Sequence, residues 1–325
     1  MATVKDKVLE ILENNKGNAI SGEEIANRLG VSRNSIWKAV NSLKLKGYKI
    51  DAVPNLGYTL SADSDILSAA VISKYLNVDC DVEVFNSLKS TNDWLKDIAV
   101  SEVNEGKVIV AKTQTGGKGR LGRSFYSPDS SGVYFSVLLR PKIPADRAVL
   151  ITTCAAVAVA ESIDDITGKS TEIKWVNDIF LNGKKVCGIL NEATFDLETY
   201  GLQYVVLGIG INVTPPKNGY PNDINNIAGS IFENDDILPD TKSRLIANVL
   251  NRFFHYYKHI ENKEFITVYR DKFNLKNKPI YVFRGNEREE AIAREITDDF
   301  GLLIEYKNGI KKVLNSGEVS IRGAK

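Results

Sequence analysis

The ten residues from Gln114 to Arg123 combine the side chains that handle a phosphate. Four glycines lie there together with three cations, Lys118, Arg120 and Arg123. Glycine lets the backbone come close to a ligand and adopt a positive φ, and neighbouring Lys and Arg side chains place positive charge where an anion would bind. We therefore predict a phosphate-handling loop, and the alternative is a mobile basic surface loop.

The spacing Gly117-x-Gly119-x-x-Gly122 also matches the dinucleotide-binding fingerprint. That motif requires a strand before it, a helix directly after it and an acidic residue about 20 positions further on. Residues 108–111 are typical of a buried strand, but a turn-rich segment and a second strand over 133–139 follow where the helix should begin. No ribose-binding carboxylate ends that strand. The pattern predicts a strand–loop–strand connection and excludes the dinucleotide fold.

A second group of reactive side chains surrounds a predicted hairpin. The run Lys174-Trp-Val-Asn-Asp178 precedes Asn182-Gly183, and Asn-Gly is the strongest short hairpin signal. Phe180 would then face Lys185, and alternation along the strand puts Asp178 on the same face. Asp178 and Lys185 would be diagonal neighbours, roughly 7–8 Å apart at Cα. An ordinary surface ion pair is the alternative.

The composition describes an ordinary globular chain. Its 325 residues are 43% hydrophobic and 26% charged, which allows two or three domains. The net charge of +1 excludes a globally basic nucleic-acid binder but allows a local basic patch. Three cysteines without a CxxC pair, and a start without signal-peptide shape, lead us to expect a cytoplasmic protein. Residues 148–160 are apolar but too short to span a bilayer, so we expect a buried helix and no membrane partner.

Residues 1–62 carry the pattern of a winged helix-turn-helix. Helices are expected over 4–14, from a Ser21-Gly-Glu-Glu24 capping box to Gly30, and after a Ser32 cap, with two short strands as the wing. Six Lys or Arg and no acid lie between positions 28 and 50. The exposed face of the third helix would offer DNA these residues: Ser32, Arg33, Asn34, Trp37 and Lys38. A winged helix used only for protein contacts is the alternative.

The remaining chain divides at about residue 274. Residues 63–274 mix strands and helices, and Ser90-Thr-Asn92 begins one helix, where a plain N-cap is the alternative to a binding role. Residues 275–325 form a run of short strands with an Asn308-Gly309 hairpin, which favours a small SH3-like β-barrel. We predict an α+β multidomain chain: winged helix 1–62, mixed α/β domain 63–274, and barrel 275–325.

Two histidines raise the question of a metal. His255 and His259 are four residues apart on a predicted helix, as in half of a zinc-protease signature. Tyr256 stands where that signature has its catalytic glutamate. No third ligand is evident nearby, so we predict no metal site.

Together these residues resemble the family of bifunctional biotin protein ligases and biotin operon repressors, over essentially the whole chain. The loop Gly117–Arg123 resembles the family's GRGRRGR loop, and Lys174–Asp178 resembles its KWPND motif. Gly208-Ile-Gly-Ile-Asn212 resembles its G-x-G-I-N strand, and the tail Gly317–Arg322 resembles the end of its C-terminal domain. The order and spacing of these motifs make the resemblance specific. It implies that the central domain is a biotin-ligase catalytic domain.

The resemblance implies a two-step reaction. Biotin and ATP, which brings Mg²⁺, would form biotinyl-5′-AMP and pyrophosphate, and the biotinyl group would pass to one lysine of a biotin carboxyl carrier protein. No tightly bound, protein-ligated metal is implied. The adenylate would also promote a homodimer, which would present two winged helices to palindromic operator DNA.

The resemblance also implies a role for each site residue. Arg120 would stabilise the adenylate, Lys185 would contact the biotin carboxylate and phosphate oxygens, and Asp178 would orient or deprotonate the acceptor lysine. Biotin and its adenylate would be bound by Ser90, Thr91, Asn92, Gln114, Gly117, Lys118, Gly119, Arg120, Lys185, Gly188 and Asn212.

Three positions depart from the family pattern. Val176 replaces the proline of KWPND and restores a backbone N–H, while Lys118 and Leu121 replace two loop arginines. Because Arg120 remains, we expect the adenylate to be retained. Two other hypotheses stay open: a biotin-sensing regulator that does not transfer biotin, and a ligase for another acyl group such as lipoate. The presence of both Arg120 and Lys185 argues against the first, and the winged helix argues against the second.

Overall fold

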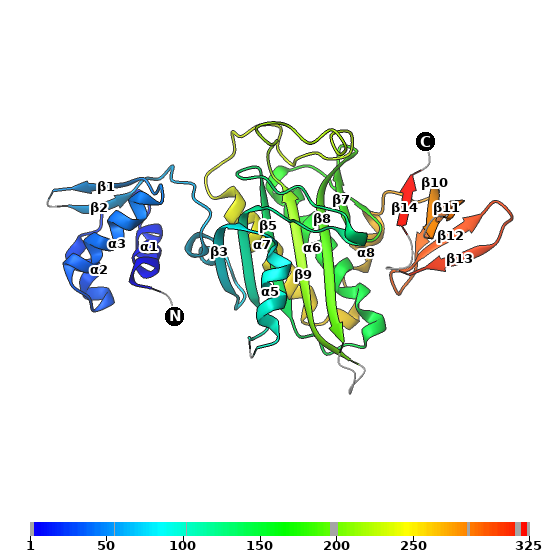
Figure 1. Ribbon diagram of the computed structural model, residues 1–325, viewed down its shortest axis with the longest axis horizontal. Helices are drawn as coiled ribbons and strands as arrows, with labels where there is room; N and C mark the ends of the chain where they lie inside the picture. The colour runs from blue at the N-terminus through cyan, green and yellow to red at the C-terminus, as the bar shows by residue number, and fades with distance from the viewer. Residues whose placement is uncertain are drawn as a thin grey trace. The chain divides into compact units, whose positions relative to one another are not determined.

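The computed structural model describes residues 3–54, 56–101, 103–195, 201–284, 287–315 and 320–323. The chain divides into two compact units (Figure 1). The first comprises Met1–Leu76 and Asp236–Ala247, and the second comprises Asn77–Asp235 and Asn248–Lys325. No helix in the described parts of the chain is long and apolar enough to cross a membrane.

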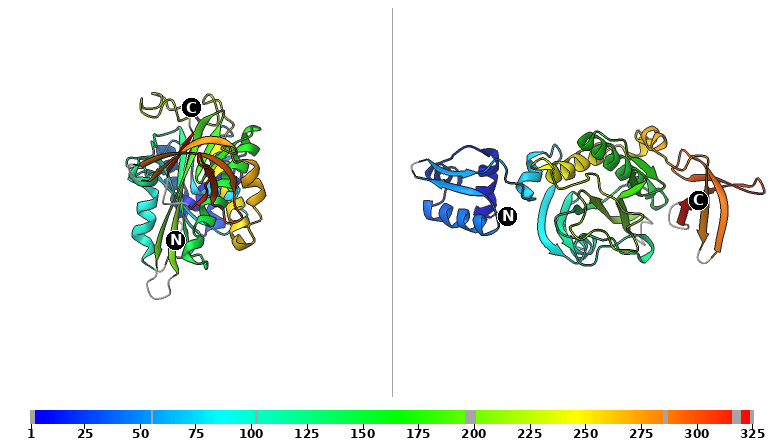
Figure 2. Two further views of the ribbon diagram at one scale, coloured as in Figure 1. Left: turned by 90° about the vertical axis from the view of Figure 1, so that its right-hand side faces the viewer. Right: turned by 90° about the horizontal axis from the view of Figure 1, so that it is seen from above.

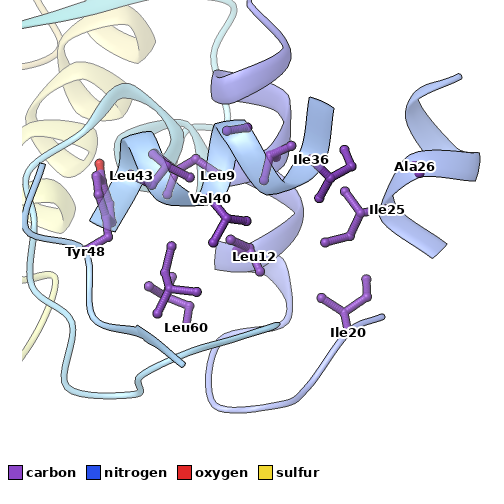
Figure 3. Packing of buried hydrophobic residues seen from close by; sticks show 13 residues of the cluster. Leu9, Leu12, Ile20, Ile25, Ala26, Ile36, Val40, Leu43, Tyr48 and Leu60 are labelled. Atoms are coloured by element: carbon purple, nitrogen blue, oxygen red, sulfur yellow. The ribbon is translucent and has the colours of Figure 1, made fainter. Parts of the chain in front are cut away.

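The first unit is a winged helix-turn-helix, as predicted. Its elements are α1 (Val4–Asn14), α2 (Gly22–Leu29), α3 (Arg33–Leu45), β1 (Ile50–Val53), β2 (Gly57–Leu60) and α4 (Ala69–Lys74). β1 and β2 pair antiparallel as the wing. Figure 3 shows how the helices and the wing enclose one apolar core, in which Ile25, Ile36 and Leu60 are fully buried.

Polar caps fix where these helices begin. The Ser21 hydroxyl accepts the N–H of Glu24 at 3.0 Å, and Ser32 caps α3 in the same way. The Glu24 carboxylate turns to Arg28, so the reciprocal half of the predicted capping box is not made there. A complete capping box forms instead between Thr3 and Asp6 at the start of α1. One such cap is worth about 1 kcal/mol.

A seven-stranded mixed sheet forms the centre of the second unit. Its order is β3-β4-β5-β9-β8-β7-β6. β3 and β4 are parallel and all other neighbours are antiparallel. In that order the bounds are Asp81–Leu88, Lys107–Gln114, Gly132–Leu139, Leu202–Asn212, Lys184–Phe195, Asp178–Leu181 and Glu172–Lys174.

Helices cover both faces of this sheet. α5 (Thr91–Ala99) lies on one face, where Leu95 packs against Leu138 and Val206. α6 (Val149–Thr167) lies on the other face, as the right-hand view of Figure 2 shows. The part of α7 (Thr241–Tyr257) that belongs to this unit contacts α6, because the Tyr256 hydroxyl donates to Glu161. α6 is buried along most of its length, as its apolar sequence predicts. On the α5 face, Asn92 in the first turn of that helix lies directly over Gly208 of β9.

The C-terminal part is a five-stranded antiparallel sheet of order β13-β12-β11-β10-β14. The bounds of β10 to β14 are Lys278–Arg284, Glu287–Ile296, Leu302–Tyr306, Lys311–Leu314 and Ser320–Gly323. Gly309 has a φ of 80° in the predicted Asn-Gly turn. The predicted run of short antiparallel strands is therefore confirmed, and within the described residues the sheet is open, with β13 and β14 at its edges.

The prediction that His255 and His259 share a helix is wrong. α7 ends at Tyr257, and His259 lies in the turn that leads to a 3₁₀ helix over Ile260–Asn262. The N–H of His259 bonds to the carbonyl of Tyr256, three residues back instead of four, which marks the end of the α-helical pattern. Within the described residues no group of three His, Cys, Asp or Glu side chains gathers that could hold a metal ion.

Candidate functional site

A floor of glycines opens the α5 face of the central sheet. Gly188 of β8 pairs with Gly210 of β9, and Gly208 lies two residues away on the same face. A Cβ atom on Gly210 would lie 2.5 Å from the ring of Phe125, and one on Gly208 would lie 2.2 Å from Oδ1 of Asn92. These positions therefore require glycine, because any larger residue would collide with the groups that lie on this floor.

At one end of the glycine floor, four polar side chains without charge gather. Thr91 and Asn92, in the first turn of α5, and Ser136 of β5 are all buried. The Ser136 hydroxyl is 2.6 Å from the Thr91 hydroxyl and 2.5 Å from Oδ1 of Asn92. Gln114 closes the group, because its Oε1 accepts the backbone N–H of Thr91 at 2.8 Å. We name Thr91, Asn92, Gln114 and Ser136 the neutral end.

Ser90 has a simpler position in the structure. It is buried, and its hydroxyl accepts the N–H of Asp93 at 3.4 Å as the N-cap of α5. That is the plain capping role that the sequence left open. The cap holds the first turn of α5, and with it Thr91 and Asn92, against the sheet.

The opposite end of the glycine floor carries charge. Nζ of Lys185 lies 2.6 Å from Oδ1 of Asp178, and both side chains are about three-quarters buried. A guanidinium nitrogen of Arg120 donates to Oδ1 of Asn177 at 3.0 Å. Burial lowers the pKa of Arg120, and the nearby Asp178 opposes that effect. We name Arg120, Asp178 and Lys185 the ionic end.

The predicted hairpin delivers this ion pair. Phe180 faces Lys185 and Leu181 faces Lys184, as the Asn-Gly turn predicts. A bulge then shifts the register, so that Asp178 faces Gly188. A Cβ atom on Gly188 would be 3.3 Å from Nζ of Lys185. The lysine therefore lies across Gly188, and this glycine lets the ammonium reach the floor.

Asn212 ends the floor on β9. Its Nδ2 donates to the carbonyl of Gly229 at 2.9 Å, and the backbone of Lys185 bonds to Ile227 and Gly229 of the same segment. Asn212 is four positions along β9 from Gly208 beside the neutral end, which is roughly 13 Å of strand. The floor therefore suits an elongated molecule with an uncharged hydrogen-bonding head and an anionic tail.

The glycine loop lies beside this floor and is internally ordered. A Cβ atom on Gly117 would come within 2.5 Å of the Phe125 carbonyl oxygen, so Gly117 permits a tight fold. The N–H of Gly119 bonds to the carbonyl of Arg123 at 2.7 Å. Nζ of Lys118 is 2.5 Å from Oδ1 of Asp93, so this exposed lysine pairs with α5. Arg120 is the loop cation that reaches the ionic end.

Four residues of the candidate site were not identified from the sequence: Phe125, Ser136, Asn177 and Glu192. Ser136 had a local signal, because it is the one small polar side chain in the apolar strand β5. Asn177 lies inside a motif that was recognised but received no role. Phe125 and Glu192, which accepts a bond from Asn92 Nδ2 at 2.7 Å, became visible only in the folded chain.

The third helix of the first unit presents its polar face outward. Ser32, Arg33, Asn34, Trp37 and Lys38 are all exposed, and Trp37 shows 55% of its surface. The opposite face, with Ile36, Val40 and Leu43, is buried in the core (Figure 3). An exposed row of cationic, amide and aromatic groups on such a helix has the composition that a DNA groove requires.

Comparisons with known proteins match both the N-terminal and the central part of the chain. Residues 4–59 match a helix-turn-helix domain family, and residues 84–212 match the biotin/lipoate A/B protein ligase family. The bifunctional ligase/repressor BirA of Bacillus subtilis is 32% identical, covering 97% of this chain and 98% of that protein. BirA of Escherichia coli is 28% identical, covering 99% and 98%.

A solved structure of a biotin protein ligase is also similar to this chain. The biotin protein ligase of Aquifex aeolicus, in complex with biotin and ATP, has a TM-score of 0.62 and 27% identity. It covers 75% of this chain, and 99% of its own length is matched. The chain belongs to the family of bifunctional biotin protein ligases and transcriptional repressors.

Proposed function

We propose that this chain joins biotin to ATP on the glycine floor and transfers the biotinyl group to a lysine of an acceptor protein. It is an ATP-dependent biotin ligase that also represses transcription. One observation carries the assignment of the site: the floor connects an uncharged polar end to a Lys185–Asp178–Arg120 end. Biotin has an uncharged ureido head and a carboxylate tail, so it fits this order.

In the first step, the biotin carboxylate attacks the α-phosphate of MgATP and pyrophosphate leaves. Two anions must approach each other, so the site must supply positive charge that is already in place. Lys185 would bind the carboxylate and Arg120 would hold the α-phosphate. Thr91, Asn92 and Gln114 would bind the ureido ring, with Ser90 supporting them. Lys118, with the backbone of Gly117 and Gly119, would close over the adenylate, and Gly188 and Asn212 would line it.

In the second step, the amine of the acceptor lysine attacks the carbonyl carbon of biotinyl-5′-AMP. An amide bond forms, the bond from that carbon to the phosphate oxygen breaks, and AMP leaves. The attacking ammonium must first lose a proton. Asp178 would orient that group and accept the proton, because its carboxylate lies on the same floor as the carbonyl. We propose a biotin carboxyl carrier protein as the acceptor.

The repressor activity belongs to the winged helix. We propose that biotinyl-5′-AMP promotes a homodimer, and that Ser32, Arg33, Asn34, Trp37 and Lys38 of each copy bind one half of a palindromic operator. We further propose a cytoplasmic protein with three domains over 1–62, 63–274 and 275–325. Sedimentation with and without the adenylate tests the dimer. An unchanged monomer at every adenylate concentration would refute it.

Biotin-dependent exchange of labelled pyrophosphate into ATP tests the ligase, with lipoate and octanoate in parallel reactions. We expect magnesium-dependent exchange with biotin and no exchange with lipoate or octanoate. Exchange with lipoate instead would identify a ligase for another acyl group. Exchange without transfer to a carrier domain would show that the adenylate serves as a signal only.

A further inference from the structure

Residues 175–178, which lead into the ionic end and include Asp178, are held by hydrogen bonds to distant segments of the chain. Trp175 and Val176, just before Asn177 and Asp178, are 4% and 1% exposed. The indole Nε1 of Trp175 donates to the backbone carbonyl of Phe300 at 2.8 Å. The hydroxyl of Tyr269 in α8 (Ile266–Asp271) donates to the carbonyl of Val176 at 3.1 Å. Both bonds are buried, so each is costly to lose.

Phe300 connects these contacts to the C-terminal sheet. It lies in the turn between β11 and β12 and is fully buried. Its ring stacks on Phe265 with centroids 5.1 Å apart and meets the edge of Tyr269 at 5.4 Å. Its φ of 58° is unusual for an aromatic residue. Two backbone bonds between Thr297 and the residues that follow keep the turn in this shape.

The same segment continues directly into the charged groups. Asn177 exchanges two hydrogen bonds with the backbone of Ile189, and its Oδ1 receives the guanidinium of Arg120. Asp178, the next residue, holds Lys185. A shift of the carbonyl of Val176 would therefore move the partners of both cations. Tyr269 is fully buried, and burial raises the pKa of its hydroxyl well above the usual value, so it stays protonated and able to donate.

We propose that Tyr269 is a positioning residue for ligation: its hydroxyl, backed by the ring of Phe300, fixes the Val176 carbonyl so that Arg120 and Lys185 meet the reacting acyl-phosphate in register. The inference rests on the proposed roles of Arg120 and Lys185. It also gives the C-terminal sheet a part in the chemistry, because the Phe300 turn belongs to that sheet. Tyr269 acts through its neighbours and need not touch biotin or ATP.

Tyr269→Phe in the full-length protein tests this proposal, since it removes only one oxygen. We expect the kcat of biotin-dependent pyrophosphate exchange to fall about tenfold, because a small displacement of a catalytic group slows the reaction strongly. The KM for biotin should change less than about twofold, because the neutral end is untouched. The matched control is Tyr256→Phe, which removes a hydroxyl that contacts Glu161 on the α6 side. Equal kcat values for the two variants, at equal stability, would overturn the proposal.

Arg120→Ala in the same series tests the proposed role of Arg120 separately from the positioning role of Tyr269. If Arg120→Ala keeps normal kcat, the proposed role of Arg120 is wrong. If Arg120→Ala is slow but Tyr269→Phe is normal, only the positioning role is wrong. If Tyr269 acts through Arg120, the double variant Arg120→Ala/Tyr269→Phe should be little slower than Arg120→Ala alone. Full additivity of the two losses would contradict that route.

A spectroscopic measurement examines the Phe300 contact without activity. The chain has three tryptophans, of which Trp37 and Trp94 are 55% and 39% exposed and Trp175 is buried. We expect one indole N–H, that of Trp175, to exchange slowly with solvent. Phe300→Gly keeps a turn that suits positive φ but removes the ring, and it should speed that exchange at least tenfold. Unchanged exchange would show that the ring does not hold the contact.

Discussion

The two ends of the glycine floor are built in opposite ways. The neutral end comes from α5 and two neighbouring strands; its Thr91, Asn92 and Ser136 are buried, and the four side chains are joined by hydrogen bonds. The ionic end comes from the glycine loop, a hairpin near the sheet edge and the segment before it, and its side chains remain partly exposed. One end is part of the core, and the other is assembled from separate segments.

This difference indicates that the two ends contribute to different steps, one to binding and the other to catalysis. A buried network that is already bonded in the right geometry recognises a ligand without rearranging, so it should govern affinity. Charged groups that must meet a developing negative charge act mainly on the transition state, so they should govern rate. The ionic end then needs outside support, which the Tyr269–Phe300 contact supplies. Variants at the two ends should therefore separate KM from kcat.

The largest effect should follow loss of charge at the ionic end. Lys185→Ala removes the ammonium that lies 2.6 Å from Asp178 and across Gly188. We expect kcat for pyrophosphate exchange to fall by about 10²–10³, the usual result of deleting one preorganised stabilising group. Steady-state exchange at varied biotin and ATP concentrations measures it. Lys184→Ala is the control, because Lys184 bonds to the Asn226 carbonyl instead. If both variants lose rate equally, the ionic end is misassigned.

Buried charge in the first unit provides a contrast with the close pair at the ionic end. Glu13 is 3% exposed and lies 3.9 Å from Lys16, which turns instead to Asp240 at 3.0 Å. Burial raises the pKa of Glu13 from 4.5 to about 7. Lys16 and Lys74 oppose this shift, whereas Asp240 and Asp65 add to it. The cost of burying this carboxylate is therefore not offset by its neighbours.

A raised carboxyl pKa makes the folded state hold a proton more tightly than the unfolded chain does. The resulting stability is complete below pH 4.5 and is lost as the pH rises through 7, by up to roughly 3 kcal/mol. Glu13→Gln cannot titrate, so it should be more stable than the parent chain at pH 8 and about equal to it at pH 4.5. Urea unfolding at both pH values measures this. The same stability difference at both would refute it.

A smaller effect should follow at the neutral end. Ser136→Ala removes a fully buried hydroxyl that bonds with Thr91 and Asn92. Leaving one buried polar partner unpaired costs about 1–3 kcal/mol, so we expect the KM for biotin to rise roughly tenfold or more with kcat retained. Ser162→Ala is the matched control, because its buried hydroxyl bonds to Ala158 within α6. A fall in kcat at constant KM would remove the distinction between the ends.

The sequence predicted the parts of the site that depend on local pattern. The strand–loop–strand connection, the Asn-Gly hairpin and the Asp178–Lys185 pair follow from spacing along the chain, and the structure confirms them. The bulge that places Asp178 opposite Gly188 had no signal, since one extra residue in a strand leaves the alternation on either side intact.

The parts that the sequence could not predict join distant segments. Ser136 and Thr91 are 45 residues apart, Tyr269 and Val176 are 93 apart, and Trp175 and Phe300 are 125 apart. No periodicity links such pairs, because each depends on how strands and helices pack after they form. The helix end before His259 was missed for a related reason: the break at Tyr257 leaves no proline or glycine in the sequence to mark it.

The smallest effect should come from the exposed ion pair between Lys118 and Asp93, which lies beside the floor. In the structure Asp93 holds this loop lysine at 2.5 Å, with the lysine 40% exposed. An exposed pair of this kind is worth less than about 1 kcal/mol. Asp93→Asn frees Lys118 for the phosphates, so we expect the KM for ATP to fall by about twofold at low salt and the difference to vanish at high salt. Asp97→Asn, one turn further along α5, removes the same charge away from the loop and should leave KM unchanged. An equal response in both variants would mean that ATP binding responds to the total charge of α5. The ammonium of Lys118 would then have no role, and Lys118 would contribute only through its backbone.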